Sequence, residues 1–126
     1  LDISMFISMP NIIISAPKDG NDLKRIFRTA LKSNKGFVIR YPKGSAISYD
    51  SSLSLDALDI GEWEILKDGE SCAILAVGSM VDLVMRDYEK ICTQISFKPT
   101  IVNARFIKPI DTRIMDKILK NNNKIK

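Results

Sequence analysis

Short apolar runs alternate with helix-like spacing along the first third of the chain. Residues 11–16 (NIIISA) lie between two prolines and are largely β-branched, which is typical of a buried strand. Residues 23–31 carry apolar side chains at i, i+3, i+4, i+7 and i+8, the spacing of one helix face, and residues 19–22 (DGND) supply capping groups ahead of it. Residues 37–39 (FVI) form a second buried run. The pattern predicts a β-α-β unit, a crossover that builds parallel sheets.

The second half of the chain repeats this alternation. Residues 61–66 (GEWEIL) alternate and end at a Lys-Asp-Gly turn, which favours a hairpin-like or edge strand. Residues 72–77 (CAILAV) are apolar throughout, as in a central parallel strand with both faces covered. A helix is expected from Met80 to about Thr93, with Ser79 as its N-cap. These elements predict a second parallel array.

The last quarter of the chain continues the second array. A strand is expected over residues 100–107, because Pro109 stops it, and Asp111 caps the helix that follows. The array ends at residues 121–126, where another strand would be due. Two helix faces are expected to pack on separate cores, one formed by Leu23, Ile26 and Phe27 and the other by Leu83, Val84 and Tyr88.

A segment of different composition, residues 45–59, separates the two arrays. It is rich in Ser, Asp, Ala and Leu without a sustained strand or helix period, which fits an exposed connection. We interpret it as a linker between two domains, with a long surface loop inside one domain as the alternative. The predicted fold class is α/β with parallel sheets.

Composition narrows the chemistry and the partners. The 126 residues contain no histidine, so the commonest general base and the commonest metal ligand are both missing. The net charge of +4 comes from scattered cations without interleaved aromatic residues, which argues against nucleic-acid binding, and no apolar run is long enough for a membrane span. Cys72 and Cys92 lie in apolar stretches and are expected to be buried, reduced thiols.

Three loops at the ends of predicted strands carry candidate chemistry, because ligands of open parallel sheets bind outside the carboxyl ends of the strands. Residues 40–44 (RYPKG) place two cations, Arg40 and Lys43, on a loop stiffened by proline, where they bind a phosphate or are simply solvated. Residues 78–80 (GSM) favour a tight turn with a serine cap over an anion site. Residues 103–109 (NARFIKP) end a strand with two cations, which favours an ion pair or a domain interface.

Six motifs occur together in the order found in one enzyme family: DIS (2–4), ISMPN (7–11), APKD (16–19), RYPKG (40–44), LAVGSM (75–80) and VNARFIKPID (102–111). Through them the sequence resembles the 1-deoxy-D-xylulose-5-phosphate synthase family of the thiamine-diphosphate-dependent transketolase superfamily, over nearly its whole length. The RYPKG string and the Arg-Phe-x-Lys-Pro string are fairly specific for it. The proline-asparagine and alanine-proline elements would also suit the β component of pyruvate dehydrogenase.

The resemblance implies a particular domain organisation. It implies parallel-sheet, three-layer segments of two transketolase-type domains, both incomplete. Residues 1–44 correspond to the end of the pyrimidine-binding domain, residues 45–59 to a linker and residues 60–126 to the first part of the C-terminal transketolase domain.

The resemblance also implies which site residues this chain holds. The family's catalytic histidine lies just before the position of Asp2, and its motifs for thiamine diphosphate and Mg²⁺ lie further upstream, so no catalytic, cofactor-binding or metal-binding residue is expected here. Lys43 matches a family arginine that holds the substrate phosphate, and lysine keeps the charge but loses the bidentate fork. Arg40 assists it or pairs with a carboxylate.

The activity implied is the decarboxylation of pyruvate and its condensation with glyceraldehyde 3-phosphate to 1-deoxy-D-xylulose 5-phosphate. This is the first step of non-mevalonate isoprenoid (terpenoid) biosynthesis and also serves thiamine biosynthesis. The enzyme is expected to be a homodimer, and the isolated chain is expected to be inactive. The alternative from a different class is a non-catalytic α/β module for dimerisation or regulation. The chain is biased toward Lys, Asn and Ile, which fits localisation either in an apicoplast-like plastid or in the bacterial cytoplasm.

Overall fold

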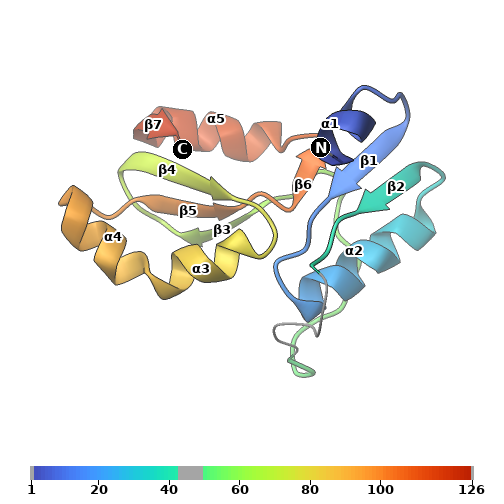
Figure 1. Cartoon of the computed structure of the whole chain (residues 1–126), viewed down its shortest axis with the longest axis horizontal. Helices are drawn as coiled ribbons and strands as arrows, with labels where there is room; N and C mark the ends of the chain where they lie inside the picture. The colour runs from blue at the N-terminus through green and yellow to red at the C-terminus, as the bar shows by residue number, and fades with distance from the viewer. Residues whose placement is uncertain (1, 43–49, 126) are drawn as a thin grey trace.

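The computed structural model describes residues 2–42 and 50–125 (Figure 1). Lys43 and part of the predicted linker therefore lie outside the described residues. The helices and strands follow in the order α1 (Asp2–Ile7), β1 (Ile12–Ser15), α2 (Gly20–Lys32), β2 (Gly36–Ile39), β3 (Glu64–Lys67), β4 (Ser71–Ala76), α3 (Met80–Arg86), α4 (Tyr88–Ile95), β5 (Thr100–Asn103), β6 (Phe106–Lys108), α5 (Thr112–Asn121) and β7 (Asn122–Ile125).

The predicted β-α-β unit is confirmed in the first half of the chain. Strands β1 and β2 pair in parallel, with Ile14 opposite Val38, and α2 connects them. Helix α2 begins where Asp19 Oδ1 accepts a hydrogen bond of 2.8 Å from the Asp22 amide, as the capping sequence predicts. This unit sets Lys18 and Asp22 beyond the carboxyl end of β1.

The prediction of a single strand over residues 100–107 is wrong. It breaks at Ala104 and Arg105 into β5, which stays in the second sheet, and β6, which pairs antiparallel with β1 in the first. The break is fixed by hydrogen bonds: the Ala104 amide donates to Ala76 O at 2.9 Å, and the Ala16 amide donates to Arg105 O at 2.8 Å. The two sheets are β2-β1-β6 and β3-β5-β4-β7.

The fold is α/β, but its sheets are mixed rather than purely parallel. Strand β4 pairs in parallel with β5 and β7, whereas β3 pairs antiparallel with β5. The edge position expected for β3 is thus confirmed, and β7 occupies the place where another strand was due. Figure 1 shows α5 on one face of this sheet and α3 and α4 on the other, so the sheet is the middle of three layers.

Two helix predictions meet different outcomes. The helix expected from Met80 to Thr93 divides at Asp87, and Ser79 makes no side-chain cap. Asp111 does cap the last helix, because its Oδ1 accepts a hydrogen bond of 3.1 Å from the Ile114 amide.

The apolar core joins both halves of the chain, which contradicts the prediction of two separate cores. Ile26 is buried in it, whereas Phe27 is 55% exposed and Leu83 is 39% exposed. The halves share a core because β6 carries Phe106 into the first sheet. The buried members of the cluster are Ile13, Ile26, Leu58, Trp63, Ala73, Val102, Ala104, Phe106 and Ile118.

The described part of the predicted linker, residues 50–59, is held against α2 rather than left exposed throughout. Thr29 Oγ1 accepts a hydrogen bond of 2.8 Å from the Leu58 amide, and Leu58 is buried. Asn21 Oδ1 likewise accepts one of 2.7 Å from the Asp50 amide. The connection therefore packs on the first half of the chain, and the domain boundary itself stays a prediction.

Two smaller expectations concern the cysteines and the membrane. Both thiols are free, but only Cys72 is buried and Cys92 is half-buried, because α4 lies at the surface of the second sheet. Across the residues that the structure describes, no helix has the length and apolar character needed to cross a membrane.

Candidate functional site

The carboxyl ends of β1, β4 and β5 converge between the two sheets. Gly78, after β4, has φ +62°, and a Cβ added to it would lie 3.7 Å from the Ala16 Cβ and 3.8 Å from Pro17 O. The turn therefore rests against the end of β1, in a backbone conformation that favours glycine. Ser79 has helical dihedral angles, and its side chain forms no cap bond. The loop is a tight turn, as expected, but without the serine cap.

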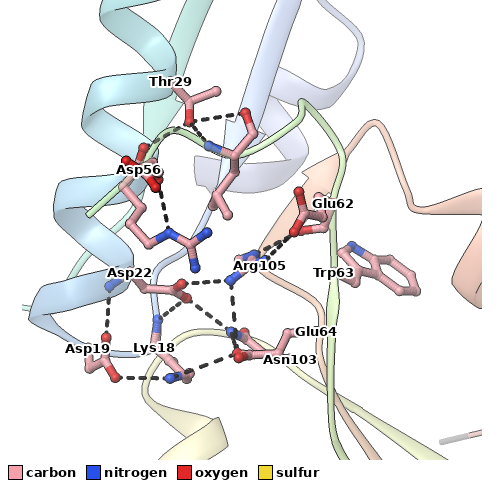
Figure 2. Close-up of polar contacts among 12 residues, drawn as sticks. Lys18, Asp19, Asp22, Thr29, Asp56, Glu62, Trp63, Glu64, Asn103 and Arg105 are labelled. Atoms are coloured by element: carbon pink, nitrogen blue, oxygen red, sulfur yellow. Dashed lines mark hydrogen bonds and ion pairs between the residues drawn. The ribbon is translucent and has the colours of Figure 1, made fainter. Parts of the chain in front are cut away.

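Arg105 lies at the centre of a buried ion-pair network between these strand ends (Figure 2). Its side chain is 2% exposed, and its Nη1 lies 2.9 Å from Asp22 Oδ1. Its Nε donates a hydrogen bond of 2.8 Å to Glu62 O, and its Nη2 lies 3.3 Å from Glu62 Oε2. The sequence favoured an ion pair or a domain interface at this string, and the ion pair is confirmed.

Asn103 extends the network from the last position of β5. Its Nδ2 donates hydrogen bonds to Asp22 Oδ2 at 3.0 Å and to Glu64 Oε1 at 3.3 Å. The residue is fully buried, and its Oδ1 has no hydrogen-bond partner among the described residues. The amide orientation follows from the two carboxylates, which accept hydrogen bonds only.

Lys18 supplies the second cation at the rim of the network. Its Nζ donates a hydrogen bond of 3.0 Å to Asp19 Oδ2 and lies 3.9 Å from Glu64 Oε1. Burial lowers the pKa of Lys18, but the hydrogen bond to Asp19 and the charges of the surrounding carboxylates outweigh burial. The pKa is therefore raised above the ordinary lysine value of 10.5.

Both cations of the network are paired within it. The guanidinium of Arg105 is shared by Asp22 and Glu62, and the ammonium of Lys18 is held by Asp19. In residues 2–42 and 50–125, no group of three or more Cys, Asp or Glu side chains is placed to hold a metal ion. The cluster is a structural joint between the first turn of α2 and the strands of the second sheet.

The structure places only one of the two predicted phosphate ligands. Arg40 follows β2, and its amide donates a hydrogen bond of 2.8 Å to Ser15 O, which fixes the start of the loop at the carboxyl edge of the first sheet. Its side chain is exposed. Lys43 is not among the described residues. Sequence reasoning missed Asp22 and Glu62 as partners of Arg105, because each is far from it along the chain and looked like an ordinary capping or surface carboxylate.

An open groove of about 630 Å³ lies along the outer side of α2. Its apolar residues are unusually exposed: Phe27 by 55%, Leu31 by 75% and Tyr41 by 65%. Such a concentration is uncommon on a surface that faces water in the working protein. The groove is lined by Leu23, Lys24, Phe27, Arg28, Leu31, Tyr41 and Leu55.

The second half of the chain is a mixed sheet with helices on both faces, and its sequence matches a known protein family. Residues 61–125 match the family described as "Transketolase, C-terminal domain", and the chain belongs to this family.

The chain is also homologous to 1-deoxy-D-xylulose-5-phosphate synthases along nearly all of its length. It is 39% identical over 120 residues to the enzyme of Dehalococcoides mccartyi, covering 95% of this chain and 19% of the relative. It is 37% identical over 124 residues to that of Dictyoglomus thermophilum, covering 98% and 20%. The chain thus spans about a fifth of the length of these relatives.

Solved structures agree on the fold. A protein described as "Split gene transketolase, inactive beta4 tetramer" superposes with a TM-score of 0.79 at 21% identity, covering 98% of this chain and 40% of that one. A transketolase from Pichia stipitis superposes with a TM-score of 0.67 at 22% identity, covering 90% and 18%. At these identities the likeness concerns the fold alone.

Proposed function

We propose that this chain is part of a 1-deoxy-D-xylulose-5-phosphate synthase, which decarboxylates pyruvate and transfers the two-carbon unit to glyceraldehyde 3-phosphate. The observation that carries the proposal is the 39% identity over 95% of the chain, which extends well beyond the residues of the family match. An unrelated protein that shared only the C-terminal transketolase domain would match over the second half alone. The expected setting is a plastid or the bacterial cytoplasm.

The proposed organisation divides the chain at the connection. Residues 1–44 form the end of a pyrimidine-binding domain, residues 45–59 a linker, and residues 60–126 the first part of the C-terminal domain. The exposed side chains of Phe27 and Leu31 support an incomplete first domain, because an apolar helix face of this kind is normally covered by further protein. A homodimer is the proposed assembly.

Within such an enzyme, the proposed role of this chain is positioning rather than bond making. The chain contains no histidine, and its described residues offer no group of three or more carboxylate or thiol side chains placed to hold Mg²⁺. The rest of the enzyme would hold thiamine diphosphate and Mg²⁺, which supply the carbanion chemistry when bound. Lys43, with Arg40 beside it, is proposed to hold the phosphate of glyceraldehyde 3-phosphate.

The deciding experiment compares two proteins. The full-length protein, loaded with thiamine diphosphate and Mg²⁺, should release carbon dioxide from pyruvate and form deoxyxylulose phosphate only when glyceraldehyde 3-phosphate is present. The purified 126-residue chain should do neither above background. Decarboxylation that does not depend on glyceraldehyde 3-phosphate would instead favour a pyruvate dehydrogenase-type β component. Complete inactivity of the full-length protein would favour a non-catalytic module.

A further inference from the structure

Strand β6 is the one described strand of residues 61–125 that lies in the first sheet. Phe106 pairs with Ser15 and Lys108 with Ile14, antiparallel to β1 (Figure 1). Every other described strand after residue 60 belongs to the second sheet. Residues 106–108 therefore place one strand of the family-matched unit, residues 61–125, in the sheet of residues 2–42.

Arg105 anchors the start of this strand. Its guanidinium contacts Asp22, in the first turn of α2, and Glu62, in the segment ahead of β3. The pair with Asp22 is shielded from water, because the two side chains are 2% and 4% exposed, so it is charge-assisted and weakly screened by salt. The Glu62 side chain is 35% exposed, so its pair with Arg105 is screened more. One side chain thereby joins α2 to the second half of the chain.

Lys108 anchors the other end of the strand. Its Nζ donates a hydrogen bond of 2.9 Å to Ile7 O and one of 2.6 Å to Met9 O. Ile7 is the last residue of α1 and Met9 lies just beyond it, and the helix has no basic residue in its own last turn. Carbonyls at a helix C-terminus lack partners within the helix and attract cations. Lys108 supplies from a distant strand the cation that α1 lacks.

Trp63 holds the first residue of the strand. Its Nε1 donates a hydrogen bond of 2.8 Å to Phe106 O, and the indole is only 6% exposed. Strand β6 is at the edge of its sheet, so this carbonyl has no strand partner on that side. The indole takes the place of that partner and links β6 to the segment ahead of β3.

We propose that residues 105–108 form a two-ended strap, in which Arg105 holds the first turn of α2 and Lys108 holds the end of α1. The strap fixes residues 2–42 against the family-matched unit. The Arg40 amide donates a hydrogen bond to Ser15 O in the strapped sheet, so Arg105 and Lys108 are positioning residues for Arg40. This last step rests on the proposed function, whereas the strap itself does not.

Amide hydrogen exchange of the 126-residue chain tests the strap. Lys108→Met keeps the length of the side chain but removes the charge, and it leaves no buried carboxylate unpaired. The amides of residues 6–15 should then exchange about tenfold faster, the loss expected for charge-assisted hydrogen bonds, while those of α3 and α4 stay unchanged. Lys108→Arg should restore slow exchange, and Lys117→Met, an exposed lysine of α5, is the matched control. Unchanged exchange at residues 6–15 in Lys108→Met overturns the strap.

Kinetics of the full-length protein test the positioning role separately. Lys108→Met should raise the KM for glyceraldehyde 3-phosphate by several fold, leave the KM for pyruvate unchanged, and be rescued by Lys108→Arg. Faster exchange with unaltered kinetics overturns the positioning role. If the full-length wild type lacks the proposed activity, the proposed function fails while the exchange result still decides the strap.

Discussion

The Nδ2 of Asn103 donates a hydrogen bond of 3.0 Å to Oδ2 of Asp22, although 81 residues separate the two along the chain. The other oxygen of Asp22 pairs with Arg105, and the Lys18 amide also donates to Oδ2 at 3.2 Å. Asp22 is 3% exposed, so a single buried carboxylate is held from three directions. The joint between the two halves of the chain is built around it.

Asn103→Asp is expected to lower the free energy of unfolding by about 2–4 kcal/mol at pH 7, because it replaces a donor by a carboxylate facing Asp22 and Glu64. Urea denaturation followed by circular dichroism measures the change. Asn34→Asp makes the same substitution at an exposed position and should cost about 0.5 kcal/mol or less. Equal effects of the two substitutions would show that the contacts of Asn103 with Asp22 and Glu64 do not stabilise the fold.

The charge on Lys18 should contribute stability over a defined pH range. Its pKa in the folded chain is raised above the ordinary 10.5, so the protonated form stabilises the fold. That contribution is fully present below the unfolded pKa and is lost as pH rises through the higher folded value. The difference in unfolding free energy between wild type and Lys18→Met should therefore be constant from neutral pH upward and shrink only above 10.5.

A matched Lys117→Met variant checks that the pH dependence belongs to Lys18. Lys117 is exposed on α5, so its substitution should give a small difference that stays flat with pH. A difference for Lys18→Met that shrinks near neutral pH would contradict the raised pKa.

Local pattern predicted β1 and α2 well, because each depends on neighbours along the chain. The β-branched run at residues 11–16 and the spacing at 23–31 gave β1 and α2 close to their observed bounds. The same spacing did not reveal which side of α2 is buried: the core takes Ile26 and Thr29, and Phe27 faces outward. That choice depends on what packs against the helix, which periodicity does not encode.

The crossing of β6 could not be predicted for the same reason. Residues 100–107 have the composition of one continuous strand, and the break depends on Arg105 finding Asp22 and Glu62 across the fold. The two cations of the string suggested an ion pair, but nothing in the sequence named their partners. The phosphate loop was recognised through family resemblance rather than through local physics.

Truncating an aromatic residue in each half of the chain should destabilise the fold to very different extents. Phe106→Ala removes a fully buried ring from the shared core and is expected to cost about 3–5 kcal/mol of unfolding free energy. Phe27→Ala removes a ring that is 55% exposed and should cost about 1 kcal/mol or less in the 126-residue chain. Chemical denaturation of both variants measures the difference, and a large loss for Phe27→Ala in the isolated chain would contradict the placement of that ring.

Lys43→Ala tests the proposed phosphate contact in the full-length protein. Pro42 stiffens the loop after β2, and the Arg40 amide bonded to Ser15 O fixes where the loop leaves the sheet. A charge-assisted contact to a phosphate contributes about 1.5–3 kcal/mol, and each 1.4 kcal/mol corresponds to tenfold in affinity. The KM for glyceraldehyde 3-phosphate should therefore rise by roughly ten- to a hundredfold, with that for pyruvate nearly unchanged.

Lys43→Arg should preserve or improve the contact, because it restores the bidentate fork. Steady-state kinetics with each substrate varied in turn measure this, and an equal effect on both substrates, or none on either, would make residues 40–44 a solvated turn.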